Sequence, residues 1–181
     1  MKLRALLSSC TLLARVAAVA VQNNDAGVTY EGIRRDGIDV FYSVPYGQDT
    51  GGANRFKPPK PFVAKAGTSI RANSQGAVCP QPRGDYFSPL YLSNVTEISE
   101  DCLHLNIYRP AGISSHANVP VMLHIHGGSF FIGSKDELVI QPEGLVLRSV
   151  QMGLPVIFVT ISYRLGGMCH LVRFSLDTHT T

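Results

Sequence analysis

The residues best suited to chemistry form the run His126-Gly127-Gly128-Ser129-Phe130, which directly follows an apolar stretch of the sequence. Adjacent glycines at the end of a strand let the backbone approach a ligand and turn its N–H groups toward one point. Two such donors at about 2.9 Å would each stabilise the negative oxygen of a tetrahedral intermediate by roughly 3 kcal/mol. The same glycines are also typical of a tight turn. The run by itself therefore leaves two interpretations open.

A second candidate site is the pair His124 and His126, which point to the same face of one expected strand. A His-x-His pattern can hold zinc, but a zinc site needs at least one further protein ligand. His104 lies on a different expected strand, and the six histidines otherwise form no cluster. We therefore expect no metal and no other cofactor.

The sequence around the glycines predicts a βαβ unit that would position them. Residues 119–126 form an apolar strand that stops at glycine, and residues 155–161 are continuously apolar and β-branched. The second pattern is typical of a strand covered on both faces of a parallel sheet. Between the two, Pro142 and Glu143 open a helix that ends at Gly153.

Antiparallel strands are expected on the N-terminal side of this unit. Residues 28–31 and 38–41 flank Asp36-Gly37, which is a strong hairpin signal. Residues 47–84 are rich in proline and glycine, which indicates a long irregular region. A half-buried strand follows at 102–108, with an apolar face formed by Leu103, Leu105 and Ile107. The predicted fold class is α/β, with an N-terminal β-hairpin and a mixed sheet that contains one βαβ unit.

The composition is that of an ordinary globular protein: 181 residues, 45% of them hydrophobic, with a formal charge of +3. Three of the 16 basic residues, Lys2, Arg4 and Arg15, precede the first acidic residue. The other 13 basic residues balance the 13 acidic ones. A balanced chain with no basic cluster has nothing to neutralise a phosphate backbone, so nucleic acid is not an expected partner.

Residues 1–20 have the features of a secretory signal peptide. A basic start precedes an apolar run, and Ala18-Val19-Ala20 has the spacing of small residues that a signal peptidase accepts. Arg15 interrupts the apolar run. No other segment approaches 18 consecutive apolar residues, so no transmembrane segment is expected. The predicted location is therefore extracellular.

A secreted chain has consequences for its cysteines and asparagines. Removal of residues 1–20 leaves Cys79, Cys102 and Cys169, of which one pair would be oxidised and one thiol left over. Asn94-Val95-Thr96 is a glycosylation acceptor, which predicts that Asn94 lies in a surface loop.

Five motifs stand in one order along residues 27–167: Arg55-Phe56-Lys57-Pro58-Pro59, Cys79-Pro80-Gln81, the segment 99–110, His126-Gly127-Gly128-Ser129-Phe130 with Gly133-Ser134, and Ser162-Tyr163-Arg164-Leu165-Gly166. Together they resemble the type B carboxylesterase/lipase family, which includes the cholinesterases. The resemblance implies an α/β-hydrolase fold and secretion. It also implies hydrolysis of carboxylic ester substrates by a serine nucleophile with a histidine and an acid as its partners.

The resemblance also implies roles for individual residues. Gly128 and Ser129 occupy the positions whose backbone N–H groups form the oxyanion hole of the family, and the second is usually glycine or alanine. Serine keeps the N–H group but adds a side chain that can hydrogen-bond locally. Cys79 and Cys102 match the first disulfide of the family, and Arg55 and Glu100 match its structural ion pair. Arg164 resembles the family arginine that pairs with an acid later in the family pattern.

The catalytic residues of the family are missing from these motifs. The fold presents its serine in a Gly-x-Ser-x-Gly elbow, and the sequence contains no such pentapeptide. We therefore expect an incomplete α/β-hydrolase fold and a chain that is inactive as written. Residues 21–167 would be the N-terminal part of the type B domain, and residues 168–181 a tail outside the family pattern. The alternative is a non-catalytic secreted binding module of the cholinesterase-like type.

An incomplete domain should also expose apolar surface. The strand at 156–161 expects neighbours on its sides and helices on both faces, but the sequence predicts a single helix. An unpaired apolar edge promotes aggregation. We therefore expect the polypeptide to be poorly soluble or to bind the dye ANS strongly.

Overall fold

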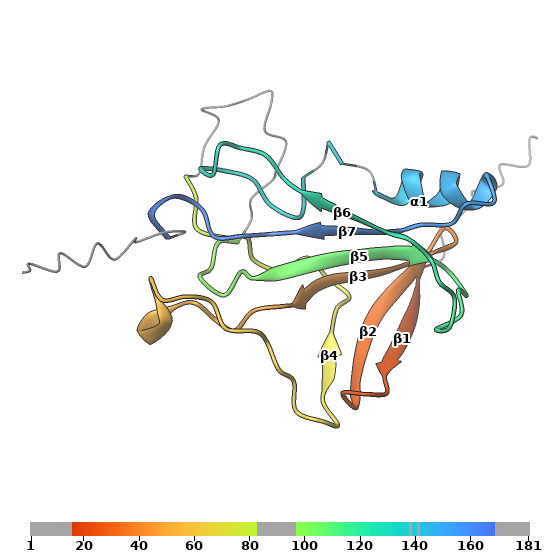
Figure 1. Ribbon diagram of the computed structural model, residues 1–181, viewed down its shortest axis with the longest axis horizontal. Helices are drawn as coiled ribbons and strands as arrows, with labels where there is room; N and C mark the ends of the chain where they lie inside the picture. The colour runs from red at the N-terminus through yellow and green to blue at the C-terminus, as the bar shows by residue number, and fades with distance from the viewer. Residues whose placement is uncertain (1–15, 83–96, 138, 141, 169–181) are drawn as a thin grey trace, which may run out of the picture.

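The computed structural model describes residues 16–82, 97–137, 139–140 and 142–168 (Figure 1). Seven strands form one mixed sheet in the order β1-β2-β3-β5-β7-β6, and β4 pairs with β2 outside that path. The elements are β1 (Ala17–Asn23), β2 (Val28–Arg35), β3 (Ile38–Pro45), β4 (Ser69–Arg71), β5 (His104–Pro110), β6 (Val121–Ile125), α1 (Pro142–Gln151) and β7 (Ile157–Ile161), with 3-10 turns at Gly52–Asn54 and Gly166–Met168.

The predicted N-terminal hairpin is confirmed. β2 and β3 pair antiparallel, and the turn between them has a φ of 50° at Asp36 and 83° at Gly37. Two positive φ values give the turn the twist that matches the strands on either side. β1 adds a further antiparallel strand to β2. Its residues 17–20 belong to the predicted signal peptide, whose residues 1–15 lie outside the described chain.

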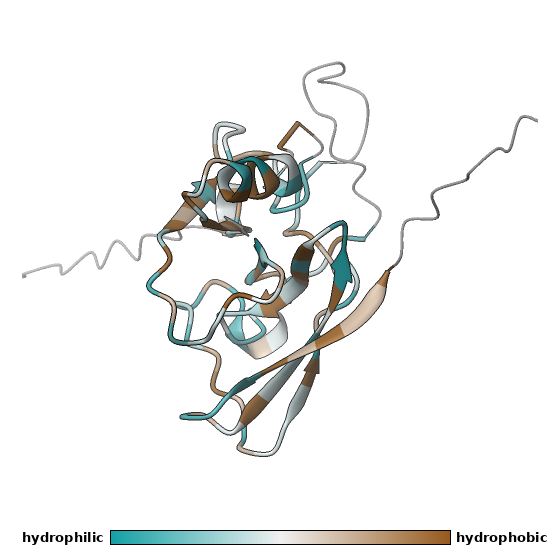
Figure 2. Cartoon of the chain, turned by 90° about the vertical axis from the view of Figure 1, so that its right-hand side faces the viewer, coloured by the Kyte–Doolittle hydropathy of each residue, from teal (hydrophilic) through white to brown (hydrophobic). Residues whose placement is uncertain are grey.

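The predicted βαβ unit is also confirmed. β6 and β7 pair parallel, and α1 connects them. The helix stops where the sequence predicts, because Gly153 adopts a φ of 72° and the N–H of Leu154 turns back to donate to the carbonyl of Ser149. Apolar and polar residues share the helix surface (Figure 2), and Val146 is fully buried against the sheet.

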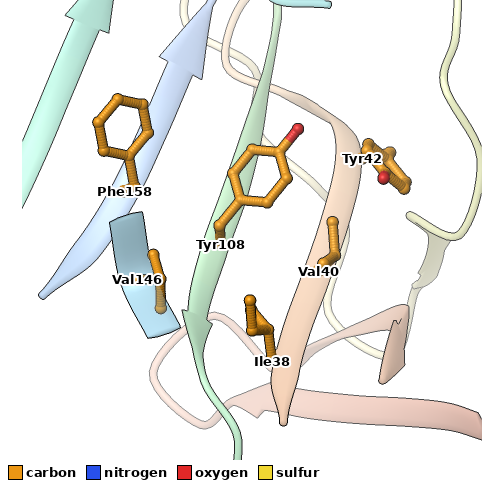
Figure 3. Close-up of a cluster of buried hydrophobic side chains, with 6 residues drawn as sticks. All are labelled: Ile38, Val40, Tyr42, Tyr108, Val146 and Phe158. Atoms are coloured by element: carbon orange, nitrogen blue, oxygen red, sulfur yellow. The ribbon is translucent and has the colours of Figure 1, made fainter. Parts of the chain in front are cut away.

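Two apolar clusters pack on opposite faces of the sheet. The larger cluster lies under α1 (Figure 3) and consists of Ile38, Val40, Tyr42, Tyr108, Val146 and Phe158. The second contains Phe41, Val44 and Ala72, with β1 and β5 side chains packed around it. β3 contributes to both clusters, because Phe41 points to the face opposite Val40 and Tyr42. Val44 joins the Phe41 cluster because the strand register shifts between Phe41 and Val44.

β5 differs from its predicted pattern. Leu105 and Ile107, expected on the only apolar face, are half-buried, whereas Asn106 and Tyr108 on the other face are buried. The reason is that α1 covers the Tyr108 face, which makes β5 a strand packed on both faces. The region 47–84 also contains the strand β4, which has three residues and is too short to produce a periodic signal.

The exposed apolar edge is not where we expected it. β7 lies inside the sheet between β5 and β6, so the edge strand is β6. Val121, Leu123 and Ile125 of β6 are 61%, 57% and 62% exposed. β7 is covered on one face only, because Phe158 and Thr160 are buried while Ile157, Val159 and Ile161 are partly exposed.

Candidate functional site

The glycine run leaves the carboxyl end of β6, beside its parallel partner β7. In open α/β sheets, ligands bind outside the carboxyl ends of the strands. The loop of residues 126–133 lies at this end and returns into the buried residues Ile132, Gly133 and Ser134. We call residues 126–133 the glycine loop.

A tight turn shapes the glycine loop. The N–H groups of Phe131 and Ile132 both donate to the carbonyl of Gly128, at 2.9 and 3.2 Å. Gly128 has a φ of 105°, and a side chain there would overlap the Ile132 carbonyl. Ser129 and Phe130 follow with φ values of 55° and 58°. Such values cost roughly 1–3 kcal/mol per non-glycine residue and are concentrated at functional sites.

The turn leaves two adjacent backbone donors open. Within the described ranges, neither the N–H of Gly128 nor that of Ser129 donates to another protein group. Gly128 is half-buried and Ser129 is exposed, so both amides are within reach of a ligand. Successive N–H groups in such a turn form a concavity that binds anions. The arrangement can hold a negatively charged oxygen.

His126 supports the base of the glycine loop. Its ring stacks on Tyr163 with centroids 4.2 Å apart, and the Tyr163 hydroxyl donates to the His126 carbonyl at 2.7 Å. Nδ1 lies 2.8 Å from the Gly127 carbonyl, which can only accept, so this nitrogen carries the proton. Burial lowers the pKa of His126, which keeps the ring neutral. We therefore assign His126 a structural role at the base of the glycine loop.

The two histidines of the His-x-His pattern have separate environments. His124 is half-buried and its ring lies against Phe158, whereas His126 is buried against Tyr163. Across the part of the chain that the structure describes, no three histidine, cysteine, aspartate or glutamate side chains are grouped to hold a metal ion.

The structure brings together both residue pairs that the family resemblance implies, the disulfide and the ion pair. Cys79 and Cys102 form the predicted disulfide, packed against Leu103. Both Nε and a terminal nitrogen of Arg55 donate to the Glu100 carboxylate. The Arg55 guanidinium lowers the pKa of Glu100 below its usual value.

Three further expectations have different outcomes. Arg164 is partly exposed and donates to the backbone carbonyl of Lys57 at 2.9 Å, and it has no carboxylate partner among the described residues. Asn94 lies outside the described residues, as do residues 169–181 of the predicted tail. None of the helices in the described ranges has the length and apolar character needed to cross a membrane.

A buried polar network follows the glycine loop and escaped the sequence analysis. The Lys135 ammonium, which is fully buried, donates to Asp136 at 2.6 Å, and Asp136 also accepts from Asn106 of β5 at 2.8 Å. The Thr160 hydroxyl of β7 donates to the Lys135 carbonyl at 2.8 Å. These contacts fasten the return of the loop to two strands. No periodicity or short motif indicates this network, because Asn106 and Thr160 are distant in sequence from Lys135 and Asp136.

Comparisons with known proteins agree with this geometry. The family model described as "Carboxylesterase family" matches residues 23–177, which is most of the chain and reaches past residue 167. The chain therefore belongs to the carboxylesterase family, and its sheet is part of an α/β-hydrolase fold.

Individual relatives and structures show how much of a family member is present. The chain is 43% identical over 142 residues to "Inactive carboxylesterase-like protein VdtD" of Byssochlamys spectabilis and 42% identical over 159 residues to a secreted lipase of Arthroderma benhamiae. These matches cover 78% and 86% of this chain but 24% and 27% of the relatives. The crystal structure of juvenile hormone esterase from Manduca sexta matches with a TM-score of 0.69 at 30% identity, over 84% of this chain and 27% of that one. The chain thus spans about a quarter of their length.

Proposed function

We propose that the glycine loop is the oxyanion hole of a serine carboxylic ester hydrolase, with the N–H groups of Gly128 and Ser129 as its donors. One observation carries this proposal: two adjacent amides, which have no hydrogen-bond partner among the described residues, lie in a strained turn at the carboxyl end of β6. Membership of the carboxylesterase family and relatives named as lipases support the substrate class.

In the proposed reaction, a serine hydroxyl attacks the ester carbonyl carbon and the carbonyl oxygen becomes an oxyanion. The Gly128 and Ser129 amides would hold that oxyanion while the alcohol leaves, and water would then release the acid from the acyl-serine. The 181 residues contain no Gly-x-Ser-x-Gly elbow to present such a serine. We therefore propose that these residues alone do not hydrolyse esters.

Two measurements test the proposal. The purified chain should release p-nitrophenol from p-nitrophenyl esters no faster than buffer, and serine-dependent hydrolysis that an organophosphate blocks would overturn the inactivity. In the second, the 15N-labelled chain is titrated with an alkyl phosphonate monoanion, a mimic of the oxyanion. The amide signals of Gly128 and Ser129 should shift with saturation, while that of Gly112, in a remote loop, should not. Unmoved Gly128 and Ser129 signals would contradict the oxyanion hole.

Secretion and processing belong to the same proposal. Relatives include secreted lipases, and residues 1–20 have the pattern of a signal peptide. Expression in a eukaryotic secretory host should yield a secreted chain without residues 1–20, as N-terminal sequencing would show. A mass decrease on endoglycosidase treatment, lost in Asn94→Gln, would support glycosylation at Asn94. An intact N-terminus or an intracellular product would contradict secretion.

The alternative function is a non-catalytic secreted binding module. The observation that favours it is a relative at 43% identity, VdtD, whose name describes it as inactive. Mass spectrometry of a secretome would support it by detecting a stable product that spans only residues 21–181. The phosphonate titration separates the alternatives further, because a binding module needs no anion contact at Gly128 and Ser129.

A further inference from the structure

Gln81 belongs to a motif that the proposed function leaves unused, yet its side chain contacts the glycine loop. Its Nε2 donates to the carbonyl of Gly133 at 2.9 Å, and its Oε1 accepts from the N–H of Gly133 at 2.9 Å. One primary amide thus satisfies both backbone groups of a single residue, 52 positions away in sequence. Gly133 is buried, so water has no access to replace these bonds.

Gly133 is the last residue of the glycine loop, and it lies against the first residue, His126. It has a φ of 119°, and any side chain on it would overlap the ring of His126. The residue is therefore held between the His126 ring on one side and the Gln81 amide on the other. Because the Gly128 turn ends immediately before it, a displacement of Gly133 would move the turn that carries the two open amides.

Gln81 is itself held in place. Its Nε2 also donates to the carbonyl of Cys79 at 3.2 Å, and Cys79 is bonded to Cys102. Both cysteines are almost completely buried, with exposed fractions of 1% and 0%. The disulfide therefore forms a rigid base two residues before the glutamine.

Other parts of the glycine loop have separate tethers. The Tyr163 hydroxyl holds the carbonyl of His126, and the N–H of Gly166 donates to the carbonyl of Phe130 at 2.7 Å. Within the described residues, the backbone of Gly133 is held by Gln81. At this end of the loop, Gln81 is therefore the side chain that hydrogen-bonds the Gly133 backbone, two residues before the Lys135 network.

We propose that Gln81 is a positioning residue for the oxyanion hole and that the Cys79–Cys102 disulfide is its anchor. The proposal rests on the proposed function for its catalytic meaning. Loss of the Gln81 amide would leave two buried backbone groups of Gly133 without partners, which is costly enough to make the loop rearrange. Reduction of the Cys79–Cys102 disulfide would also weaken the contact between Gln81 and Gly133, because Cys79 holds Gln81 in place.

Amide hydrogen exchange on the intact chain tests the clamp without needing activity. In Gln81→Leu, the Gly133 amide should exchange about tenfold faster or more, and the Gly128 and Ser129 signals should broaden or shift. Gln75→Leu is the matched control, because Gln75 is exposed and makes no hydrogen bond to the glycine loop within the described residues. The Ile107 and Val159 amides of the sheet should keep their exchange rates, which shows that each variant is folded.

Two further variants separate positioning from simple loss of packing. In Gln81→Glu, the ionised carboxylate can accept from the Gly133 N–H but cannot donate to its carbonyl. Protection of Gly133 should therefore recover as the pH falls below about 4, where a neutral carboxyl donates again, in contrast to Gln81→Leu. The double variant Cys79→Ser/Cys102→Ser should speed Gly133 exchange several-fold if the disulfide anchors Gln81.

The outcomes are distinct. Unchanged Gly133 exchange in Gln81→Leu would overturn the clamp, and unchanged exchange in the double cysteine variant would overturn the anchor. Global loss of sheet protection in Gln81→Leu would also contradict a local positioning role. If the phosphonate titration fails while Gln81→Leu frees Gly133, the proposed oxyanion function is wrong and the clamp on the loop remains.

Discussion

The strands around β3, on the N-terminal side of the sheet, bury their apolar side chains far better than β6 at the other side of the sheet. On the N-terminal side, Ile38 and Val40 of β3 are fully buried under α1, and Phe41 packs on the opposite face. On the other side, Leu123 and Ile125 of β6 are more than half exposed, although their strand is just as apolar in sequence. Similar residues thus have different environments, because α1 and two neighbouring strands surround β3, whereas β6 has one neighbouring strand among the described residues.

The glycine loop follows β6, the strand on the more exposed side of the sheet. An edge strand with one neighbour cannot by itself fix the loop that follows it, and the structure instead uses contacts from outside the sheet. Gln81, Tyr163 and Gly166 each hold one part of the loop. The well-packed side therefore contains the two apolar clusters of the sheet, and contacts from distant residues shape the candidate site.

The largest effect is expected from removing a buried side chain on the packed side. Ile38→Ala should lower the free energy of unfolding by about 2–5 kcal/mol, because it removes buried methyl groups and leaves a cavity under α1. Urea denaturation followed by circular dichroism measures this change.

Ile125→Ala is the matched control on β6, where the same residue type is 62% exposed. Surface substitutions change stability by about 0.5 kcal/mol or less. Equal losses for the two variants would show that β6 is buried in solution, for example against another copy of the chain, and would contradict the difference between the two sides.

The next effect concerns the disulfide, which links the N-terminal loop region to β5. The bond closes a separation of 23 residues, and its removal in Cys79→Ser/Cys102→Ser should cost roughly 3 kcal/mol on the chain-entropy account. Urea denaturation should show this loss under oxidising conditions. With excess reductant, the unmodified chain and the variant should become equal, and a persistent difference would assign the effect to packing at Cys79 and Cys102.

Local signals made the packed side predictable from the sequence. Asp36-Gly37 specifies the hairpin because both residues accept a positive φ, and Pro142 and Gly153 mark the ends of α1. The glycine run also located the candidate site, since glycines at the end of a strand are a local feature. The disulfide came from the family resemblance, not from residue spacing.

Features that depend on strand order could not be predicted in the same way. Periodicity identifies the apolar residues of 155–161 but cannot tell whether that strand lies inside the sheet or at its edge. Tyr108 becomes buried because α1 crosses above it, and that depends on the tertiary path of the chain. The contact of Gln81 with Gly133 spans 52 residues, so no local pattern could reveal it.

A smaller effect is expected from pH, and it reports on the side that carries the glycine loop. Burial lowers the pKa of His126 and of His104 below the ordinary value near 6.5. Below about pH 6.5, these two histidines therefore bind protons more readily in the unfolded chain than in the folded chain. The free energy of unfolding should be highest above about pH 6.5 and should decrease as the pH falls toward 5.

Single substitutions assign this dependence to the buried rings. His126→Phe should make the free energy of unfolding less dependent on pH between 7 and 5, and His104→Phe should do the same. His116→Phe is the control, because His116 is exposed in a loop, and its slope should match that of the unmodified chain. A slope that no histidine substitution alters would assign the pH dependence to other groups.

The smallest effect is expected from the ion pair between Arg55 and Glu100, which lies at the surface near the disulfide. Arg55 is half exposed, and solvent screens such pairs strongly. Because Arg55 lowers the pKa of Glu100, the pair contributes above the ordinary glutamate pKa, and its contribution is lost as the pH falls through the folded-state value. Arg55→Ala should thus lower the urea midpoint slightly at pH 7, and this difference should shrink as the pH falls below the ordinary glutamate pKa. Arg71→Ala, at an exposed position of β4, should leave the urea midpoint unchanged. A loss in Arg55→Ala that does not shrink as the pH falls would instead come from packing of the arginine's methylene groups.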